Sequence, residues 1–179
     1  DMTGDDWKKL RNIKNRFYNN LAVKTEDVKN IDKNKLKEIL LCWIKKRAPR
    51  DRADYGYYLN LIENNFNGFD MARVHLIDGE PCSFSAGWKI PNSDNFYYAI
   101  GIFNYRFSDM GDFVTLDDLL LIKKMGYKGV DLGGSDKAIL SFKKKFFPAS
   151  IYRTYIFTIS KKEFNKALDR FIRMSSNHD

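Results

Sequence analysis

Apolar residues recur at helical spacing through the first third of the chain. A weak apolar stripe over residues 7–21 lies in a basic segment, and a more regular stripe follows over residues 36–44. Pro49 ends the second stripe, because proline lacks the amide hydrogen that a helix interior needs. A third stripe over residues 58–62 ends near Gly68. The pattern predicts three helices in this part of the chain.

The period of the apolar pattern changes to two in the middle of the chain. Residues 71–77 and 81–88 predict two strands joined by Asp78-Gly79, a dipeptide typical of tight hairpins. Residues 95–103 are apolar at both alternating sets of positions, which predicts a central strand covered on both faces. Gly101 inside this strand indicates a bulge, or the close approach of another backbone or a ligand.

The rest of the chain alternates between helix and strand. The predicted elements are a helix over residues 112–125, a strand over 129–132 closed by Gly133-Gly134, a helix capped by Ser135, a strand over 151–159, and a last helix opened by the capping box Ser160 to Glu163. This order of elements predicts the α/β (α+β) class, with a mixed twisted sheet and helices on both faces. We expect a single domain over residues 1–179, because no linker or repeat divides the chain.

Composition narrows the class of protein. Hydrophobic residues make up 44% of the chain, which is enough for a core, and no apolar run approaches the ~20 residues that span a bilayer. Cys42 and Cys82 lie in apolar patterns without metal-ligand spacing, which predicts reduced, buried thiols in a cytoplasmic protein that uses no metal. The opening residues, 1–4, resemble neither a signal peptide nor a natural start, so we expect either a chain trimmed at its start or a domain cut from a longer protein.

Positive charge is the strongest bias in the composition. The formal net charge is +8, and the basic residues gather in three clusters: Lys8, Lys9, Arg11, Lys14 and Arg16; Lys45, Lys46, Arg47, Arg50 and Arg52; and Lys143, Lys144 and Lys145. Such clusters favour a partner that bears phosphates. A nucleotide cofactor, a tRNA and an anionic lipid surface are the three candidates. A solvated basic face in a chain rich in lysine is the alternative.

The segment from residue 102 to residue 118, where a strand opens into a helix, is the first candidate for chemistry. Free N–H groups and the helix dipole favour a phosphate at such a junction, and Arg106 adds positive charge. The residues expected to contact such a ligand are Gly101, Ile102, Asn104, Arg106, Gly111 and Asp112. An ordinary strand-to-helix loop has the same pattern and is the alternative.

A second candidate combines the strand end at Gly133-Gly134 with the lysines of the following helix. The glycine pair lets the chain turn sharply into that helix, and Lys143 lies in the helix's last turn. A cation there also interacts favourably with the helix dipole, so simple capping is the alternative. His75 is the one histidine outside the tail, and no serine or cysteine lies in a nucleophile elbow, so the pattern does not predict a hydrolase triad.

These two candidates, in this order of elements, resemble a known family. Residues 95–125 look like the acyl-donor half of a GNAT acyltransferase domain, in which the donor's pantetheine pairs with a splayed central strand and its pyrophosphate sits on the next helix. The chain has Arg106 and Gly111 but lacks the compact Arg/Gln-x-x-Gly-x-Gly/Ala run of that family.

Two other segments resemble a particular branch. The run from Val130 to Gly134, with Phe142-Lys143 and Phe146, is similar to the strand and the Phe-Lys-x-x-Phe helix of Fem-type peptidyltransferases, which take an amino acid from aminoacyl-tRNA. The opening from Trp7 to Phe17 resembles the basic helix that begins the C-terminal domain of phosphatidylglycerol lysyltransferases. The resemblance covers roughly residues 7–160 and implies a catalytic role for Lys143. The general-acid tyrosine of many acetyl-CoA enzymes would fall near Phe142.

The resemblance implies an N-acyltransferase that works by direct attack of an acceptor amine or hydroxyl on the donor carbonyl. The donor is an acyl-CoA or an aminoacyl-tRNA, and the acceptor is a small molecule, a peptide or a lipid. Asp131, Asp112, Tyr105 and the substrate itself are open candidates for the base. The expected partners are tRNA or anionic lipid at the basic helices and a second domain of the same chain, with membrane association left open. A catalytically silent module that binds nucleic acid or membrane is the alternative.

Overall fold

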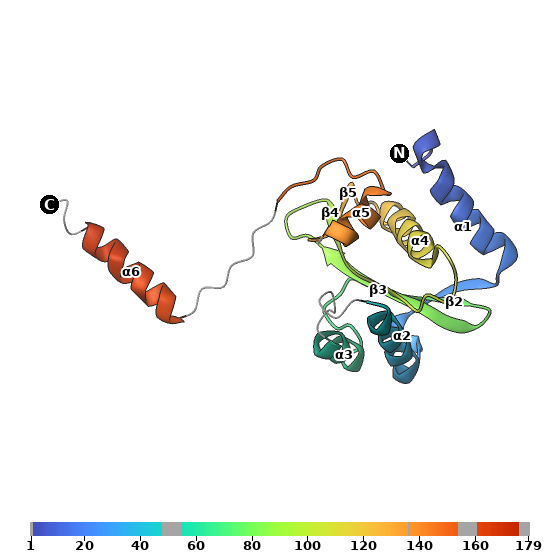
Figure 1. Cartoon of the computed structure of the whole chain (residues 1–179), viewed down its shortest axis with the longest axis horizontal. Coiled ribbons are helices and arrows are strands. Elements are labelled where there is room, and N and C mark those ends of the chain that lie inside the picture. The colour runs from blue at the N-terminus through green and yellow to red at the C-terminus, as the bar shows by residue number, and fades with distance from the viewer. Residues whose placement is uncertain (1, 48–54, 136, 154–160, 176–179) are drawn as a thin grey trace. The chain divides into compact units, whose positions relative to one another are not determined.

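The computed structural model describes residues 2–47, 55–135, 137–153 and 161–175. The chain divides into two compact units, residues 1–147 and 148–179. The elements of the first unit are the 3-10 helix Asp5–Trp7, α1 (Lys8–Asn20), β1 (Val23–Asp27), the 3-10 helix Val28–Asn30, α2 (Lys33–Lys46), α3 (Tyr55–Glu63), β2 (Met71–Ile77), β3 (Glu80–Lys89), β4 (Asn95–Phe103), α4 (Met110–Lys124), β5 (Gly129–Asp131) and α5 (Lys137–Lys144) (Figure 1). The second unit contains α6 (Lys161–Ser175). The single domain over 1–179 stays a prediction.

A five-stranded mixed sheet forms the centre of the first unit, which confirms the predicted fold class. The strand order is β1-β2-β3-β4-β5, in which β4 and β5 are parallel and the other neighbours are antiparallel. β4 therefore lies inside the sheet, beside its edge strand β5. The sequence pattern missed β1, because most of its residues are polar and exposed. The predicted strand over 151–159 lies largely outside the described residues.

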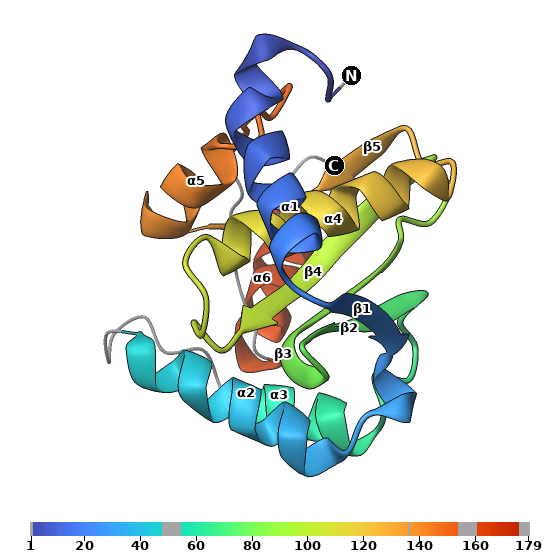
Figure 2. The ribbon, with the colours of Figure 1, turned by 90° about the vertical axis from the view of Figure 1, so that its right-hand side faces the viewer.

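Helices cover both faces of the sheet, as Figures 1 and 2 show, with α2 and α3 on one face and α1 and α4 on the other. The hairpin is confirmed, since Asp78 and Gly79 both have positive φ, as its tight turn requires. Helix α4 begins two residues earlier than predicted, at Met110, and α5 begins two residues after the predicted cap Ser135. Cys82 is buried and Cys42 is half-buried, and both are free thiols. In the described part of the chain, no helix is long and apolar enough to cross a membrane.

A β-bulge in β4 turns its side chains over between the two faces. Gly87 pairs with Tyr98 and Ala86 pairs with Ile100, so Ala99 is the extra residue. Before the bulge, Phe96 and Tyr98 pack with residues of α4, and after it Ile100 packs on the α2–α3 face. The predicted irregularity in this strand is therefore present, two residues before Gly101.

The bulge coincides with the point at which β4 and β5 separate. The parallel ladder contains three pairs and ends at Tyr97 with Asp131. From Tyr98 to Phe103, no described residue forms a strand beside that edge of β4. We call this region the split. It opens toward the loop that leads into α4, and its closed end is marked by Tyr97 and Asp131.

Candidate active site

The loop from β4 to α4 is held in a defined shape at the open end of the split. Asn104 N donates to the Cys82 carbonyl (2.9 Å), and the Asn104 side-chain oxygen accepts from Arg106 N (3.0 Å). The Cys42 thiol donates to the Asn104 carbonyl (2.9 Å), which ties the loop to α2. Arg106 is exposed, and its guanidinium carbon lies 5.5 Å from the centre of the Phe107 ring. Arg106 therefore carries its positive charge at the surface of this loop.

The start of α4 leaves its first amide groups without a side-chain cap. Asp109, the residue before the helix, has φ of 60° and makes no capping hydrogen bond; its carboxylate instead accepts from Arg16 of α1 (2.9 Å). The buried Asp112 accepts from Lys145 Nζ at 2.9 Å through both oxygens, which connects α4 to the chain just after α5. The first amides of any helix lack intrahelical partners and favour an anion, but two carboxylates already lie at this helix start.

Several predicted donor contacts have packing partners of their own. A Cβ on Gly101 would lie 2.8 Å from the Tyr98 hydroxyl, and a Cβ on Gly111 would lie 2.8 Å from the Phe103 ring. Ile102 is buried in the apolar core of the α2–α3 face. These glycines are thus required by close aromatic contacts, and the roles of the six predicted residues as ligand contacts stay predictions.

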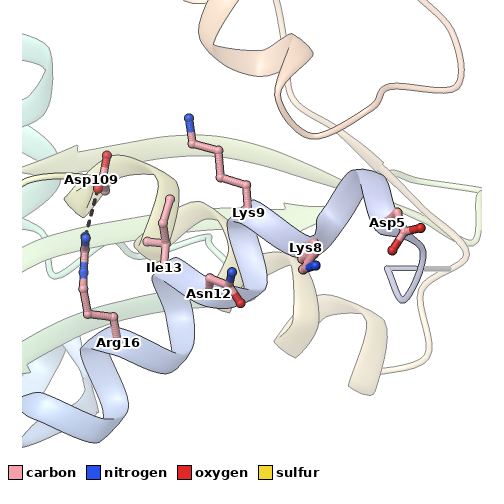
Figure 3. Close-up of a pocket in the computed structure, with 7 residues that line it drawn as sticks. All are labelled: Asp5, Lys8, Lys9, Asn12, Ile13, Arg16 and Asp109. Carbon is pink, nitrogen blue, oxygen red and sulfur yellow. Dashed lines mark hydrogen bonds and ion pairs between the residues drawn. The ribbon is translucent and has the colours of Figure 1, made fainter.

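A shallow groove of about 580 Å³ lies between α1 and the start of α4 (Figure 3). Its lining residues are Asp5, Lys8, Lys9, Asn12, Ile13, Arg16 and Asp109. The other cations of the basic helix have partners inside the protein. Arg11 donates to the carbonyls of Met2 (3.1 Å) and Gly4 (2.8 Å), and Lys14 lies 3.9 Å from Asp117. Lys8, Lys9 and Arg16 are the cations that α1 presents in this groove, where Arg16 pairs with Asp109.

The loop from β5 to α5 is organised by Lys143. Its ammonium group donates to three consecutive carbonyls, those of Leu132, Gly133 (3.1 Å) and Gly134 (3.1 Å). Three contact partners of Lys143 thus lie in the preceding loop. The three lysines of this cluster also have different surroundings, because Lys145 pairs with Asp112 and Lys144 is exposed. The contacts of Lys143 indicate that it holds the loop in position. Its catalytic role stays a prediction.

Three side chains form a row at the closed end of the split. Trp88 pairs in register with Tyr97, and Tyr97 with Asp131, across β3, β4 and β5. The Trp88 and Tyr97 rings lie 4.8 Å apart, and the Asp131 carboxylate accepts from Gly133 N (2.7 Å). Burial, followed by the nearby Asp131 and Tyr57, raises the pKa of Tyr97. The sequence pattern identified Asp131 but not the two aromatic residues.

A buried charged cluster beneath α4 was not predicted at all. It consists of Arg73, His75, Tyr98, Asp117 and Asp118. Arg73 lies 2.9 Å from Asp117 and 3.2 Å from Asp118, and the Tyr98 hydroxyl donates to Asp118 (2.8 Å). His75 Nε2 lies 3.2 Å from the Asp117 carboxylate. Polar residues at alternate positions of β2, and paired aspartates in an apolar helix, were the signals in the sequence.

The cluster continues to a serine but does not form a hydrolase site. His75 Nδ1 lies 3.0 Å from the Ser83 hydroxyl, and both residues are fully buried beneath α4. Burial raises the pKa of Asp118 despite the opposing charges of His75 and Arg73. For Asp117, burial acts in the same direction, but the hydrogen bond and charge of His75, together with Arg73, lower its pKa to about 2. The contacts indicate a structural network that fixes α4 on the sheet.

Comparison with known proteins identifies the fold. Neither a protein-family model nor a curated protein matches the chain. Among solved structures, it is similar to the C-terminal domain (DUF2156) of a putative lysylphosphatidylglycerol synthetase from Agrobacterium fabrum (16% identity, 83% of this chain and 53% of that one, TM-score 0.57). L-PGS from Bacillus licheniformis gives nearly the same values (15%, 83% and 53%, TM-score 0.55). The chain thus spans about half the length of these two proteins.

A second kind of structure matches over its whole length. The aminoglycoside acetyltransferase meta-AAC0020, from an uncultured soil metagenomic sample and in complex with sisomicin, is 14% identical, with 80% of this chain and 98% of that one covered and a TM-score of 0.54. The ribosomal-protein-alanine N-acetyltransferase from Brucella melitensis is 13% identical, with 78% and 99% covered and a TM-score of 0.54. Together with the split sheet, these similarities show that the chain has the GNAT fold.

Proposed function

We propose that the chain is an acyltransferase that transfers an acyl or aminoacyl group to an acceptor amine or hydroxyl by direct attack. The observation that carries the proposal is the split between β4 and β5, with α4 starting at its open end. An extended group can pair with the free edge of β4 as an added strand, which fixes both its direction and its depth. The similar solved structures include proteins named as acetyltransferases and as a lysylphosphatidylglycerol synthetase, which supports this reaction class.

The residues around the split divide the work of the reaction. The arm of the donor lies along Tyr98 to Phe103, so that its carbonyl comes near Asp131 at the closed end. The acceptor nitrogen attacks this carbonyl, the bond from the carbonyl carbon to the donor's sulfur or oxygen breaks, and the nitrogen loses a proton. Asp131 is the best placed of the candidate bases, since Asp112 is buried and paired with Lys145. Lys143 keeps the loop after Asp131 in place.

The groove on α1 supports a donor with more phosphates than a small thioester carries. Lys8, Lys9 and Arg16 lie in this groove, which reaches Asp109 at the start of α4. An aminoacyl-tRNA would use such a surface, whereas an acyl-CoA would need only the helix start and Arg106. One observation favours the silent module instead: Asp109 and Asp112 lie at the helix start where a pyrophosphate would bind, and they already pair with Arg16 and Lys145.

Thermal shifts with coenzyme A, acetyl-CoA and an aminoacyl-tRNA mimic test the proposal. We expect at least one of these donors to raise the midpoint of unfolding, and Arg106→Ala to reduce the shift while Lys24→Ala, a distant lysine on β1, leaves it unchanged. If tRNA is the donor, its affinity should fall steeply with salt. Replacing Lys8, Lys9 and Arg16 should make the slope of log affinity against log salt shallower, by about 0.7–0.9 for each phosphate that these side chains neutralise. No shift with any donor would favour the silent module.

A further inference from the structure

The second unit of the chain differs from the first in having no buried side chains among its described residues. It contains α6, and every side chain described over residues 148–153 and 161–169 is exposed. In the first unit, by contrast, the apolar stripe of α2 is buried in the core of the α2–α3 face. A helix that is apolar on one side has to bury that side against another apolar surface. We therefore expect α6 to have a partner.

The apolar side of α6 is a regular stripe. Phe164, Ala167 and Leu168 lie three and four residues apart, and the sequence continues this spacing at Phe171 and Ile172. Phe164 is 53% exposed and Leu168 is 44% exposed, so this side of the helix is accessible to a ligand.

The opposite side of α6 carries positive charge. Lys162 and Lys166 are each two residues away from Phe164, a spacing that places them on a different side of a helix. Over its length the helix has five basic residues, against the two acids Glu163 and Asp169. An apolar stripe combined with an excess of lysine and arginine is typical of helices that lie in the surface of an anionic bilayer.

We propose that α6 docks in the plane of an anionic lipid surface, with Phe164 and Leu168 at the boundary of the acyl chains and its basic residues attracted by the lipid phosphates. The helix lies in the surface and does not cross it, since its 15 residues are fewer than the ~20 that span the hydrocarbon core. The inference goes beyond the proposed acyl transfer and depends on neither its donor nor its acceptor.

Charge and the apolar stripe together favour lipid over two other partners. Pairing with the α6 of a second copy would bring two positively charged helices together, and like charges repel. An RNA would attract the basic residues but leave Phe164 and Leu168 in water. An anionic bilayer surface satisfies both sides of the helix, because it offers acyl chains to the stripe and negative charge to the lysines.

The first test compares the binding of the whole chain to two kinds of vesicle, one of phosphatidylcholine alone and one of phosphatidylcholine and phosphatidylglycerol in equal parts. We expect co-sedimentation with the anionic vesicles, weakened by salt. Leu168→Asp should weaken this binding by about tenfold or more, because it places a charge in the stripe. Leu41→Asp is the matched control, since Leu41 is a 42%-exposed leucine on α2, and its affinity should stay nearly unchanged.

The second test concerns the charged side of the helix. Replacing Lys162 and Lys166 by glutamine should weaken binding to anionic vesicles by about tenfold, because each lysine near the surface adds to the attraction. Replacing Lys123 and Lys124, two adjacent exposed lysines of α4, removes the same charge elsewhere and should have little effect.

The outcomes distinguish the lipid surface from the other partners. Equal binding to both kinds of vesicle, or equal weakening by Leu41→Asp and Leu168→Asp, overturns the proposal. So does a chain that binds no vesicles but binds tRNA through the two α6 lysines, or one in which Leu168→Asp changes only the sedimentation coefficient, as expected for a second copy. Donor-induced thermal shifts are measured without lipid, so acyl transfer stands or falls separately.

Discussion

The two faces of the sheet are built from different chemistry. On the α2–α3 face the buried core is wholly apolar, and its members include Leu36, Leu40, Phe84 and Ile100. On the α1–α4 face, apolar clusters coexist with the charged cluster of Arg73, His75, Tyr98, Asp117 and Asp118. Packing on the α2–α3 face depends on the volume and shape of apolar side chains. Packing on the α1–α4 face depends in addition on ion pairs and hydrogen bonds between specific atoms.

This difference bears on the site because α4 begins at the open end of the split. Apolar burial is non-directional, whereas paired charges and hydrogen bonds between specific atoms also fix the register of a helix. Asp117 and Asp118 bind residues of β2 and β4, so they fix α4 against the strand that forms the split. The charged cluster therefore stabilises one position of the donor end, and four predictions test this comparison of the two faces.

Arg73→Met should have the largest effect on the free energy of unfolding. Removing this guanidinium leaves two buried carboxylates without their main counter-charge, which costs about 3–5 kcal/mol. Urea denaturation measures the loss. The triple variant Arg73→Met, Asp117→Asn, Asp118→Asn should recover much of it, because the buried negative charges are gone. If the free energy of unfolding of the single variant falls by less than about 1 kcal/mol, Arg73 is not the main counter-charge of the two buried carboxylates.

Leu40→Ala probes the apolar face and should cost about 3 kcal/mol, because it removes buried apolar surface and leaves a cavity. Its cost should be the same at neutral and at acidic pH, since the neighbours in its core carry no charge. Urea midpoints at both pH values check this. A cost that changes with pH would mean that the two faces are coupled through the sheet.

The sequence alone did not predict most of this difference between the two faces of the sheet. The helices α1 and α2, the hairpin and β4 each depend on a local period, which is readable residue by residue. The split depends on where β4 leaves β5, and the bulge that Gly101 indicated lies two residues earlier, at Ala99. The charged cluster depends on the register of β2 against β3 and on the rotation of α4. Neither is encoded within a single element.

The site shows the same limit. Asp131 and Lys143 were found because they lie in one recognisable run, and the junction at Arg106 because a helix start has known electrostatics. The row of Trp88, Tyr97 and Asp131 was missed because Trp88 and Asp131 are distant in sequence and both pair with Tyr97 only in the folded sheet. Gly101 and Gly111 suggested a ligand, but the partners that approach them are aromatic rings of the protein itself.

Acid should weaken the charged face through Asp117. Its pKa falls from 3.8 to about 2 in the folded protein, so its contribution is present above the unfolded value and is lost as pH falls toward 2. The contribution is about 2 kcal/mol. Asp118 has the opposite sign, because its raised pKa makes the folded state bind a proton more readily.

Two variants separate these opposing contributions to acid sensitivity. Asp117→Asn should reduce the loss of stability between about pH 6 and about pH 3, whereas Asp118→Asn should increase it. Urea denaturation across this range gives both slopes. Equal slopes in both variants would show that other carboxylates dominate the acid limb.

The smallest effect distinguishes two serines on one strand. Ser83 and Ser85 are both buried on β3 beneath α4, but only Ser83 contacts His75, at 3.0 Å. The Ser85 hydroxyl makes no hydrogen bond of good geometry in the part of the chain that the structure describes, although its proximity lowers the pKa of both Asp118 and Tyr98. Ser83→Ala should therefore cost about 1 kcal/mol, because it leaves a buried imidazole nitrogen without a partner, and Ser85→Ala should cost less. Chemical denaturation of the two variants measures the difference directly. A larger cost for Ser85→Ala would mean that its hydroxyl supports Asp118 and that the charged cluster extends along β3 by one more residue pair.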